Sequence, residues 1–486
     1  MGNGPRRRGA PWADALVIGA CFLLLYILLG QWTWYKIDGQ ITVMRMAEGG
    51  PGHPRHLLAD EALRAFLALI EPLGLSTYAA VRLFSAVGAA AAGVVLHRCA
   101  ARIGLSRTRC ALAQTALAST PSLMFYASIV EFHATLLFCA SLAFYVTTWL
   151  GTQDPWQTKS WLPKLASAAL AGALSGLATL QHASGQVLPA LLLPWLFVLA
   201  WPAARTSRAV LLRLLACMAS IAVVHAAVVK GVPYVIRRYD LLERFAPLAS
   251  EDAGAMSYVT WHLESLSFAD LRFVPTTLFF EWVLPFVPVS LLCLFAARRV
   301  HRGALIALGV GLVPPLAISF LLMRHENEFG AYTIPCALLA SLLAARCAPP
   351  RLLVGSTLLA LFAAVVHVRL HDQDLTGRRL AEALRRAGSI EQVLLLVANE
   401  AERDAALMAL PHRAFPQYLW IEAYAAHATR EVFERWLQEQ EKLGRRVLAT
   451  SACLSWLGTA QLTKDAYRSS DAQIDALPGA AWIHVR

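Results

Sequence analysis

The feature that most constrains this chain is a series of apolar segments that are each long enough to cross a lipid bilayer. A membrane-spanning helix needs roughly 20 apolar residues, and the sequence has about eleven such segments joined by polar loops. Hydrophobic residues make up 57% of the 486 residues, and charged residues only 15%. Because this composition excludes ordinary soluble domains, we predict a polytopic, mainly α-helical membrane protein.

The first predicted span covers residues 13–34 and follows Arg6, Arg7 and Arg8. No small-residue cleavage site follows it, so we interpret it as a retained helix and not as a signal peptide. Ten further spans are predicted at residues 76–97, 110–128, 133–150, 165–182, 186–203, 209–230, 275–297, 303–323, 329–345 and 352–369.

The chain has a formal net charge of +11, and its basic residues recur in short loops between these spans. Such alternation is a topology signal of membrane proteins and does not resemble a nucleic-acid footprint. It predicts a cytoplasmic N-terminus in a bacterial inner membrane. The predicted inner-loop cations are Arg98, Arg102, Arg107, Arg109, Lys159, Lys164, Arg205, Arg208, Arg213, Arg298, Arg299, Arg302, Arg346 and Arg351.

An odd number of spans places everything after about Leu370 outside the cytoplasm. We therefore predict two domains, a transmembrane domain over residues 1–370 and a small extracytoplasmic α/β domain over residues 371–486. The second domain alternates helical stretches with short strand-like runs, which are residues 378–386, 393–397, 430–442, 447–450 and 482–485. It contains one cysteine, Cys453, which excludes a disulfide within it.

Two outer loops are longer than turns. The loop over residues 35–75 has leucines at near-helical spacing between charged residues, which predicts an amphipathic helix in the membrane interface. The loop over residues 231–274 mixes aromatic and charged residues, including Arg237 and Arg238. This loop could cover a cavity between helices.

Ionisable groups are expensive in hydrocarbon, so those at span ends need a partner or a role. In the predicted topology, these residues lie near the extracytoplasmic surface of the membrane. The candidates are Asp38, His53, Arg82, Glu131, His133, His182, Arg237, Arg238, Arg324 and Glu326.

Each candidate also has an ordinary structural interpretation. Loop carboxylates such as Glu326 and Glu328 are usually solvated, and histidines at helix ends usually form local hydrogen bonds. Arg82 could extend to lipid headgroups. The spacing of Gly172 and Gly176 indicates only a close helix contact.

Several short motifs, taken in order, resemble those of the integral membrane C-type (GT-C) glycosyltransferases. The nearest branch is that of the protein O-mannosyltransferases. The stretches that carry the resemblance are Ile37-Asp38-Gly39-Gln40, residues 49–54, Val81-Arg82-Leu83-Phe84-Ser85-Ala86, Ile129-Val130-Glu131-Phe132-His133, and residues 176–182 with Pro189.

The resemblance covers roughly residues 10–200 and implies a GT-C fold with a polyprenyl-phosphate sugar donor used outside the cytoplasm. Two departures concern the acceptor. The first loop reads His53-Pro54-Arg55-His56 where relatives are richer in Pro and Tyr. The C-terminal domain resembles no known acceptor-binding module, so the acceptor stays open.

Sugar transfer from a phosphate needs only one base, because phosphate leaves without being protonated by a carboxylic acid. Asp38 is the candidate base for an inverting transfer to a hydroxyl, with Glu131 as the second catalytic carboxylate. Arg82 and Arg324 are candidates for the phosphate, with Arg237 and Arg238 behind them.

We place His53, His133, His182 and Glu326 among the substrate-binding residues. Asp38, Glu131 and His133 could ligate a divalent cation, but no spacing demands one, so the metal is left unassigned.

Two other classes of function remain open from the sequence. A transporter or flippase for a lipid-linked or amphipathic substrate is favoured by Glu281 and His225, which lie within predicted spans. No internal repeat supports it. The third class is a non-catalytic scaffold of envelope assembly.

Overall fold

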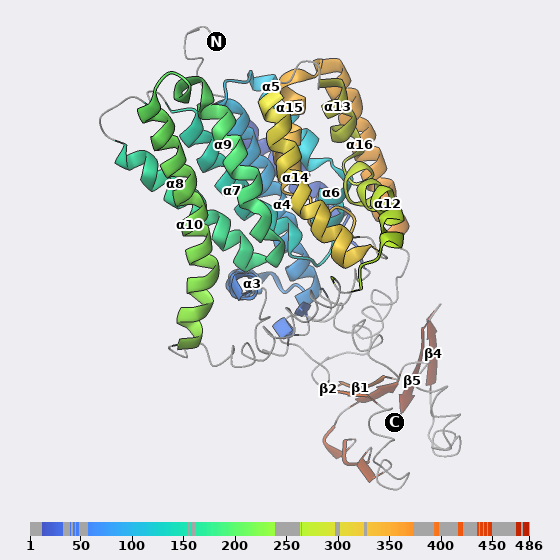
Figure 1. Ribbon diagram of the computed structural model, residues 1–486. Helices are drawn as coiled ribbons and strands as arrows, with labels where there is room; N and C mark the ends of the chain where they lie inside the picture. Colours follow the sequence, from blue (N-terminus) through green and yellow to red (C-terminus); the bar gives the residue numbers. More distant parts are fainter. Residues whose placement is uncertain are drawn as a thin grey trace. The chain divides into compact units, whose positions relative to one another are not determined.

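The computed structural model is a helical bundle followed by a small β-sheet (Figure 1). It describes residues 12–32, 57–153, 161–238, 265–296, 302–324 and 328–372, isolated residues between these ranges, and residues 393–397, 417–420, 435–449 with gaps, 473–477 and 480–485. The chain divides into two compact units, one of residues 1–30, 51–62 and 83–370, and one of residues 31–50, 63–82 and 371–486. The predicted division at residue 370 stays a prediction.

Most helices follow the predicted apolar segments, but the first helix ends at Leu28 and the helix of the predicted span 329–345 begins at Cys336. The helices are α1 (Trp12–Leu28), α3 (Leu57–Ile70), α4 (Thr77–Arg102), α5 (Arg107–Ala118), α6 (Pro121–Ala127), α7 (His133–Gly151), α8 (Leu162–Gln181), α9 (Leu188–Ala204), α10 (Arg208–Arg238), α12 (Val274–Leu278), α13 (Val287–Ala296), α14 (Arg302–Met323), α15 (Cys336–Cys347) and α16 (Pro350–His371). Short 3₁₀ turns cover Glu71–Leu73, Ala183–Val187 and Phe268–Phe273, and a π-helical turn covers Phe279–Val283.

Among the described residues, six helices are long and apolar enough to cross a bilayer, and α1 and α15 are shorter apolar helices. The chain is therefore an integral membrane protein, while the count of eleven spans and the orientation stay predictions. Two predicted spans are interrupted. Pro121, which lacks a backbone N–H, begins α6 after a break at Thr120. The π-helical turn separates α12 from α13.

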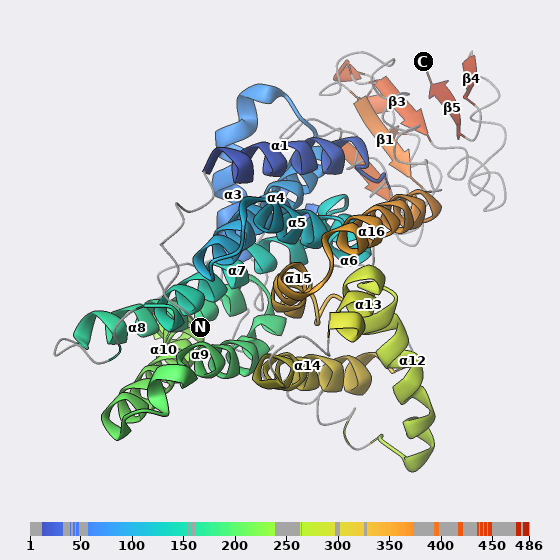
Figure 2. The same cartoon turned by 90° about the horizontal axis from the view of Figure 1, so that it is seen from above.

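The helices of the bundle run side by side (Figure 1). In the view from above, α8, α9 and α10 lie together, and α15 lies next to α13 (Figure 2). α8 packs between α7 and α10, α9 packs against α14, and α15 packs against α5 and α13. Gly172 permits the close approach of α8 and α10, because a Cβ there would lie 2.5 Å from the carbonyl oxygen of Ile221. The close contact expected from the glycine spacing is thus present.

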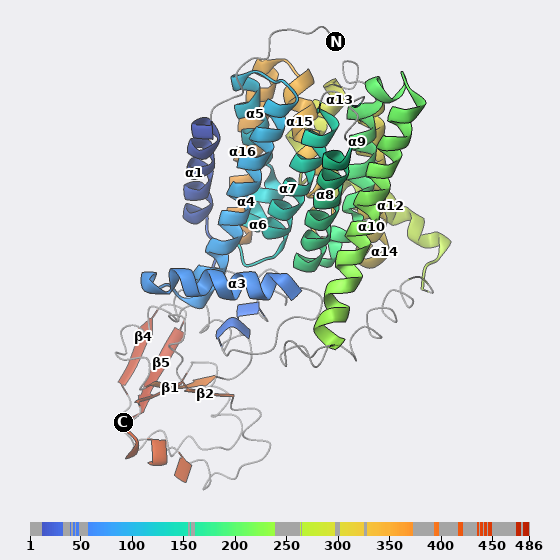
Figure 3. The ribbon, with the colours of Figure 1, turned by 90° about the vertical axis from the view of Figure 1, so that its left-hand side faces the viewer.

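The predicted amphipathic helix of the first long loop is present as α3, which Figure 3 shows in side view. Leu63 and Leu67 on one face are buried, whereas Leu69 is 77% exposed. An apolar side chain exposed on a helix of this kind is typical of a membrane-surface helix. Its place in the interface stays a prediction.

The C-terminal part contains a mixed sheet of β1 (Val393–Val397), β2 (Gln417–Trp420), β3 (Arg446–Ala449), β4 (Gln473–Leu477) and β5 (Ala480–Val485). The strand order is β2-β1-β3-β5-β4. β1 is parallel to β2 and β3, and β5 is antiparallel to β3 and β4. The helix predicted at residues 378–386 lies outside the described residues.

Candidate functional site

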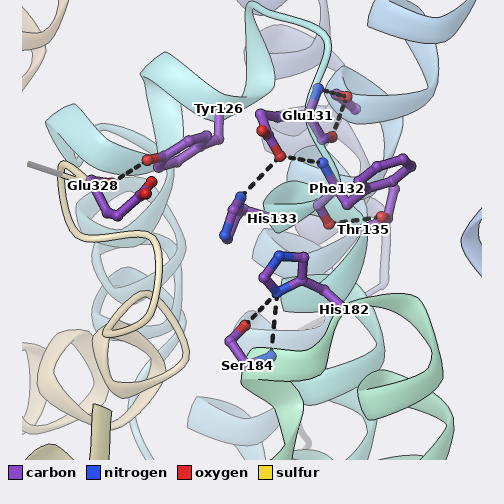
Figure 4. Close-up of polar contacts among 9 residues, drawn as sticks. Tyr126, Glu131, Phe132, His133, Thr135, His182, Ser184 and Glu328 are labelled. Atoms are coloured by element: carbon purple, nitrogen blue, oxygen red, sulfur yellow. Dashed lines mark hydrogen bonds and ion pairs between the residues drawn. The ribbon is translucent and has the colours of Figure 1, made fainter. Parts of the chain in front are cut away.

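A buried polar cluster lies where α7 begins and α8 ends (Figure 4). Successive helices of a bundle run in opposite directions, so the start of α7, the end of α8 and the residues between α14 and α15 meet at one end. His133 is the first residue of α7, Glu131 lies two residues before it, and His182 caps the end of α8. Tyr126 comes from α6, and Tyr332 precedes α15.

Glu131 and His133 form a hydrogen-bonded pair that is almost removed from solvent. His133 Nδ1 lies 3.0 Å from Glu131 Oε2, and both side chains are 5% exposed. The same carboxylate oxygen accepts the backbone N–H of Phe132 at 2.8 Å. Ser85 of α4 donates to the Glu131 carbonyl oxygen at 2.8 Å. Several donors therefore hold this carboxylate and its backbone in one place.

Aromatic rings surround the imidazole of His133. The ring centroids of Tyr126 and His182 lie 4.8 Å and 4.4 Å from it. Tyr332 lies edge-on at 6.4 Å, and the same tyrosine lies 6.3 Å from His182. Two imidazoles and two phenols thus meet beside the Glu131 carboxylate, a combination that can bind polar ligands and hold or move a proton.

His182 is fixed by the turn that follows it. Its Nδ1 accepts the backbone N–H of Ser184 at 3.2 Å, and Ser184 Oγ lies 2.8 Å from the same nitrogen. A backbone amide only donates, so Nδ1 is unprotonated and the proton of the neutral ring is on Nε2. His182 is therefore arranged as a hydrogen-bond donor through Nε2.

The structure brings together three of the candidate residues, Glu131, His133 and His182. Arg324 is 8% exposed and donates to the Ser265 hydroxyl at 3.0 Å and to the Leu321 carbonyl at 2.8 Å. Its Nε lies 3.6 Å from Asp270 Oδ2. This arginine is thus held by a carboxylate of the 3₁₀ turn Phe268–Phe273, a hydroxyl and a backbone carbonyl.

Arg82 belongs to the second unit and lies among aromatic residues. It donates to the Gln31 carbonyl at 2.8 Å, and its guanidinium carbon lies 5.5 Å and 5.7 Å from the ring centroids of Trp32 and Tyr78. The Asp372 carboxylate accepts the backbone N–H of Trp32 at 2.6 Å. The hydrogen bond and the two rings therefore fix the direction of the Arg82 side chain.

The remaining candidates are less defined. Asp38, His53 and Glu326 lie outside the described residues. Arg237 and Arg238 end α10; the side chain of Arg237 is not described, and Arg238 is exposed. Within the described residues, no group of three or more His, Cys, Asp and Glu side chains is placed to hold a metal ion. The divalent cation stays a prediction, since Asp38 would be one of its ligands.

Sequence reasoning missed Tyr126 and Tyr332 and treated Glu328 as a solvated loop residue. Glu328 is in fact only 6% exposed. Tyr126 donates its hydroxyl hydrogen to the Glu328 carbonyl oxygen. The available signal was a tyrosine at the end of an apolar segment, where its hydroxyl needs a partner. Nothing in the sequence identified that partner, which lies about two hundred residues away.

The sequence matches no known protein-family model and has no significant match among curated proteins. Its structure is similar to crystal structures of ArnT from Cupriavidus metallidurans. The form bound to undecaprenyl phosphate is 14% identical, with a TM-score of 0.52 over 96% of this chain and 97% of that chain. The apo form is 13% identical, with a TM-score of 0.55 over 97% of both chains.

The structure of the S. cerevisiae protein O-mannosyltransferase Pmt1-Pmt2 complex bound to the sugar donor is 16% identical over 46% of this chain and 34% of that chain, with a TM-score of 0.35. A similarity this low supports no argument about the branch. At the identities found for ArnT, the similarity shows a shared fold, and it covers nearly the whole of both chains.

Proposed function

We propose that this integral membrane protein, whose fold is that of the C-type (GT-C) glycosyltransferases, transfers a sugar from a polyprenyl-phosphate donor to an acceptor hydroxyl at the extracytoplasmic membrane face. The ArnT structure of this fold was solved with undecaprenyl phosphate. That lipid is a polyprenyl phosphate, the carrier that remains after the sugar has been transferred in the reaction proposed here.

One observation carries the proposal, namely the buried pair of Glu131 and His133 with His182 beside it. Titratable groups that are gathered and held in contact, here two imidazoles and two phenols beside one carboxylate, are typical of catalytic sites. The cluster lies where helices of the bundle end. A lipid-linked donor, whose phosphate stays at the membrane surface, reaches such a place.

The proposed reaction breaks the bond between the anomeric carbon and the donor phosphate oxygen. The acceptor oxygen forms the new bond to the same carbon from the opposite face, so the configuration inverts. The acceptor proton passes to Asp38, and the polyprenyl phosphate leaves with the electron pair of the broken bond. We propose that Glu131 holds His133 toward the reacting groups.

Arginines suit the leaving phosphate, because a guanidinium stays charged and binds two oxygens at once. Arg82 and Arg324 are both fixed by hydrogen bonds, which supports either in this role. We propose His53, His133, His182, Arg237, Arg238 and Glu326 as further substrate-binding residues.

Glu281 and His225, whose place within predicted spans favoured a transporter, both have hydrogen-bond partners in the protein. Glu281 accepts backbone N–H groups of residues 328 and 330, and His225 Nδ1 lies 2.9 Å from the Ser175 hydroxyl. A polar residue within a span needs such a partner for stability alone. Their burial therefore no longer favours transport over transfer.

The experiment that tests the proposal is transfer of labelled sugar from a polyprenyl-phosphate donor in membranes that supply the acceptor. Asp38→Asn keeps shape but cannot take the proton, so turnover should fall on the order of a hundredfold, with an unchanged melting temperature. Asp38→Glu displaces the carboxylate and should retain partial turnover.

Asp14→Asn is the matched control. It makes the same chemical change at a carboxylate whose hydrogen-bond partner is the exposed Arg107. Its turnover should equal that of the wild type. An Asp38→Asn variant that melts normally and transfers at the wild-type rate would exclude Asp38 as the base.

A further inference from the structure

The segment from Glu328 to Tyr332 forms one wall of the cluster around His133, and side chains from other helices hold its backbone. The Glu281 carboxylate accepts the N–H of Glu328 at 2.6 Å and the N–H of Gly330 at 3.1 Å. The Tyr126 hydroxyl donates to the carbonyl of Glu328 (Figure 4). Two side chains thus bind three backbone polar groups of this turn, namely the N–H and the carbonyl of Glu328 and the N–H of Gly330.

The turn adopts a conformation that an L-residue does not choose by itself. Phe329 has φ +47°, in the left-handed region that disfavours side chains with a Cβ. Amide N–H groups on either side of such a residue form a concave anion-binding arrangement. The Glu281 carboxylate, only 1% exposed, supplies the anion.

Glu281 is itself placed by an unusual helical element. It lies in the π-helical turn Phe279–Val283, and turns of this type are frequent at functional sites. The Thr333 hydroxyl donates to the Glu281 carbonyl oxygen at 2.7 Å. The π-helical segment therefore accepts hydrogen bonds from the turn through the Glu281 carboxylate and from Thr333 through the Glu281 carbonyl oxygen.

The far side of the turn is fixed by ring contacts. The Phe329 ring stacks on His367 of α16 at a centroid distance of 4.0 Å and an interplanar angle of 14°. Three residues later, Tyr332 lies against His133 and His182. A shift of this turn would therefore move Tyr332 relative to both imidazoles.

We propose that Glu281 is a positioning residue for the site, which sets the place of Tyr332 beside His133 and His182 by holding the turn at Phe329. The expected effect of Glu281 on turnover rests on the proposed function. Its structural part, that Glu281 fixes the turn, is independent of any activity.

Glu281→Gln is the direct test, because the amide keeps the size but offers one acceptor and faces the other N–H with a donor. Ser175→Ala is the matched control, since it removes a buried hydrogen bond within the bundle, to His225 and away from the turn. Tyr126→Phe is a second variant, which removes the hydroxyl contact to Glu328 and keeps the ring beside His133.

The first readout is hydrogen exchange of the backbone over residues 328–335. Exchange should rise about tenfold or more in Glu281→Gln and stay within about twofold of the wild type in Ser175→Ala. Equal exchange in Glu281→Gln and the wild type would overturn the inference, whether or not the protein transfers sugar.

The second readout is kcat and donor KM, each per folded protein. Glu281→Gln and Tyr126→Phe should lower kcat about tenfold or more with little change in KM, because misplaced groups lose transition-state contacts. A kcat in Glu281→Gln within about twofold of Ser175→Ala would overturn the positioning role. A wild-type protein without transfer would overturn the proposed function and leave the exchange result standing.

Discussion

The hydrogen-bond partners of the two histidines favour different tautomers. With Glu131 ionised, its carboxylate only accepts, and the contact then places a proton on Nδ1 of His133. The Ser184 amide only donates, so the neutral ring of His182 has its proton on Nε2. Their centroids lie 4.4 Å apart. Adjacent imidazoles with opposite tautomers can present an acceptor and a donor to the same ligand.

Glu131→Gln tests the carboxylate of this arrangement. The amide fills the same space but carries no negative charge, so we expect kcat to fall on the order of a hundredfold with an unchanged donor KM. Steady-state kinetics on folded protein measure both. A fall in kcat that only matches the loss of folded protein would show that Glu131 is structural.

Arg82→Ala tests the phosphate contact. If the buried guanidinium of Arg82 holds the donor phosphate, its removal should weaken donor binding by about 2–4 kcal/mol. Arg82→Lys should weaken binding less, because lysine keeps the positive charge but cannot bind two phosphate oxygens at once. Arg324→Ala and Arg324→Lys test the second candidate in the same way.

Donor binding to protein in nanodiscs measures these effects. Arg107→Ala is the control, since this arginine is exposed and contacts Asp14 only through a surface ion pair. Its donor affinity should not change. Unchanged binding in the Ala variants of both Arg82 and Arg324 would remove the support for either as the phosphate ligand.

At the scale of elements, the contact of α8 with α10 depends on residues without side chains. A Cβ at Gly176 would lie 2.6 Å from the Val228 Cβ, and one at Gly172 would meet a backbone oxygen. Backbone cannot move aside as a flexible side chain does. Between helices in a membrane, such close packing is a main source of association.

Gly172→Ala should therefore lower stability by about 1–3 kcal/mol through overpacking. Gly355→Ala is the matched control, because this helical glycine of α16 has no atom within 4 Å of its Cβ position. It should be neutral or slightly stabilising, since alanine favours helix. Thermal unfolding in the same detergent compares the two, and equal melting temperatures would contradict the packing argument.

At the scale of the whole molecule, the arginine-rich loops predict which side of the membrane each unit faces. The N-terminus should be cytoplasmic, and residues 371–486 should lie on the extracytoplasmic side together with Asp38. The sheet of β1 to β5 belongs to the same compact unit as residues 31–50. Residues of the first loop and of the C-terminal part therefore share one unit.

Cysteine labelling in intact cells tests this orientation. A membrane-impermeant maleimide should react at Cys453, a position outside the described residues, and the reaction should be absent in Cys453→Ser. Reaction at Cys453 only after the inner side is opened to the reagent would show that a span has been miscounted.

The sequence by itself determined that this chain is embedded in a lipid bilayer and where along the chain most helices lie. Hydrophobic length has a simple physical threshold, the thickness of the bilayer, so segments such as 133–150 and 303–323 could be placed within a few residues of α7 and α14. Motif order was enough to predict the GT-C fold. The local pairing of Glu131 with His133 also lies within reach of a sequence, because two residues at the start of a helix are close in any fold.

Only the tertiary structure decided which distant groups meet there. Tyr126 and Glu328 are separated by two hundred residues, and their contact follows from how α6, α14 and α15 pack. Glu281 could not be distinguished from a transport residue until its two backbone partners were known. The interruptions at Thr120 and at the π-helical turn were hidden for a related reason. Hydropathy reports the free energy of placing a whole segment in the bilayer. Whether the helix is broken within that segment depends on which other groups bind the backbone N–H and C=O groups that the break leaves without helical partners.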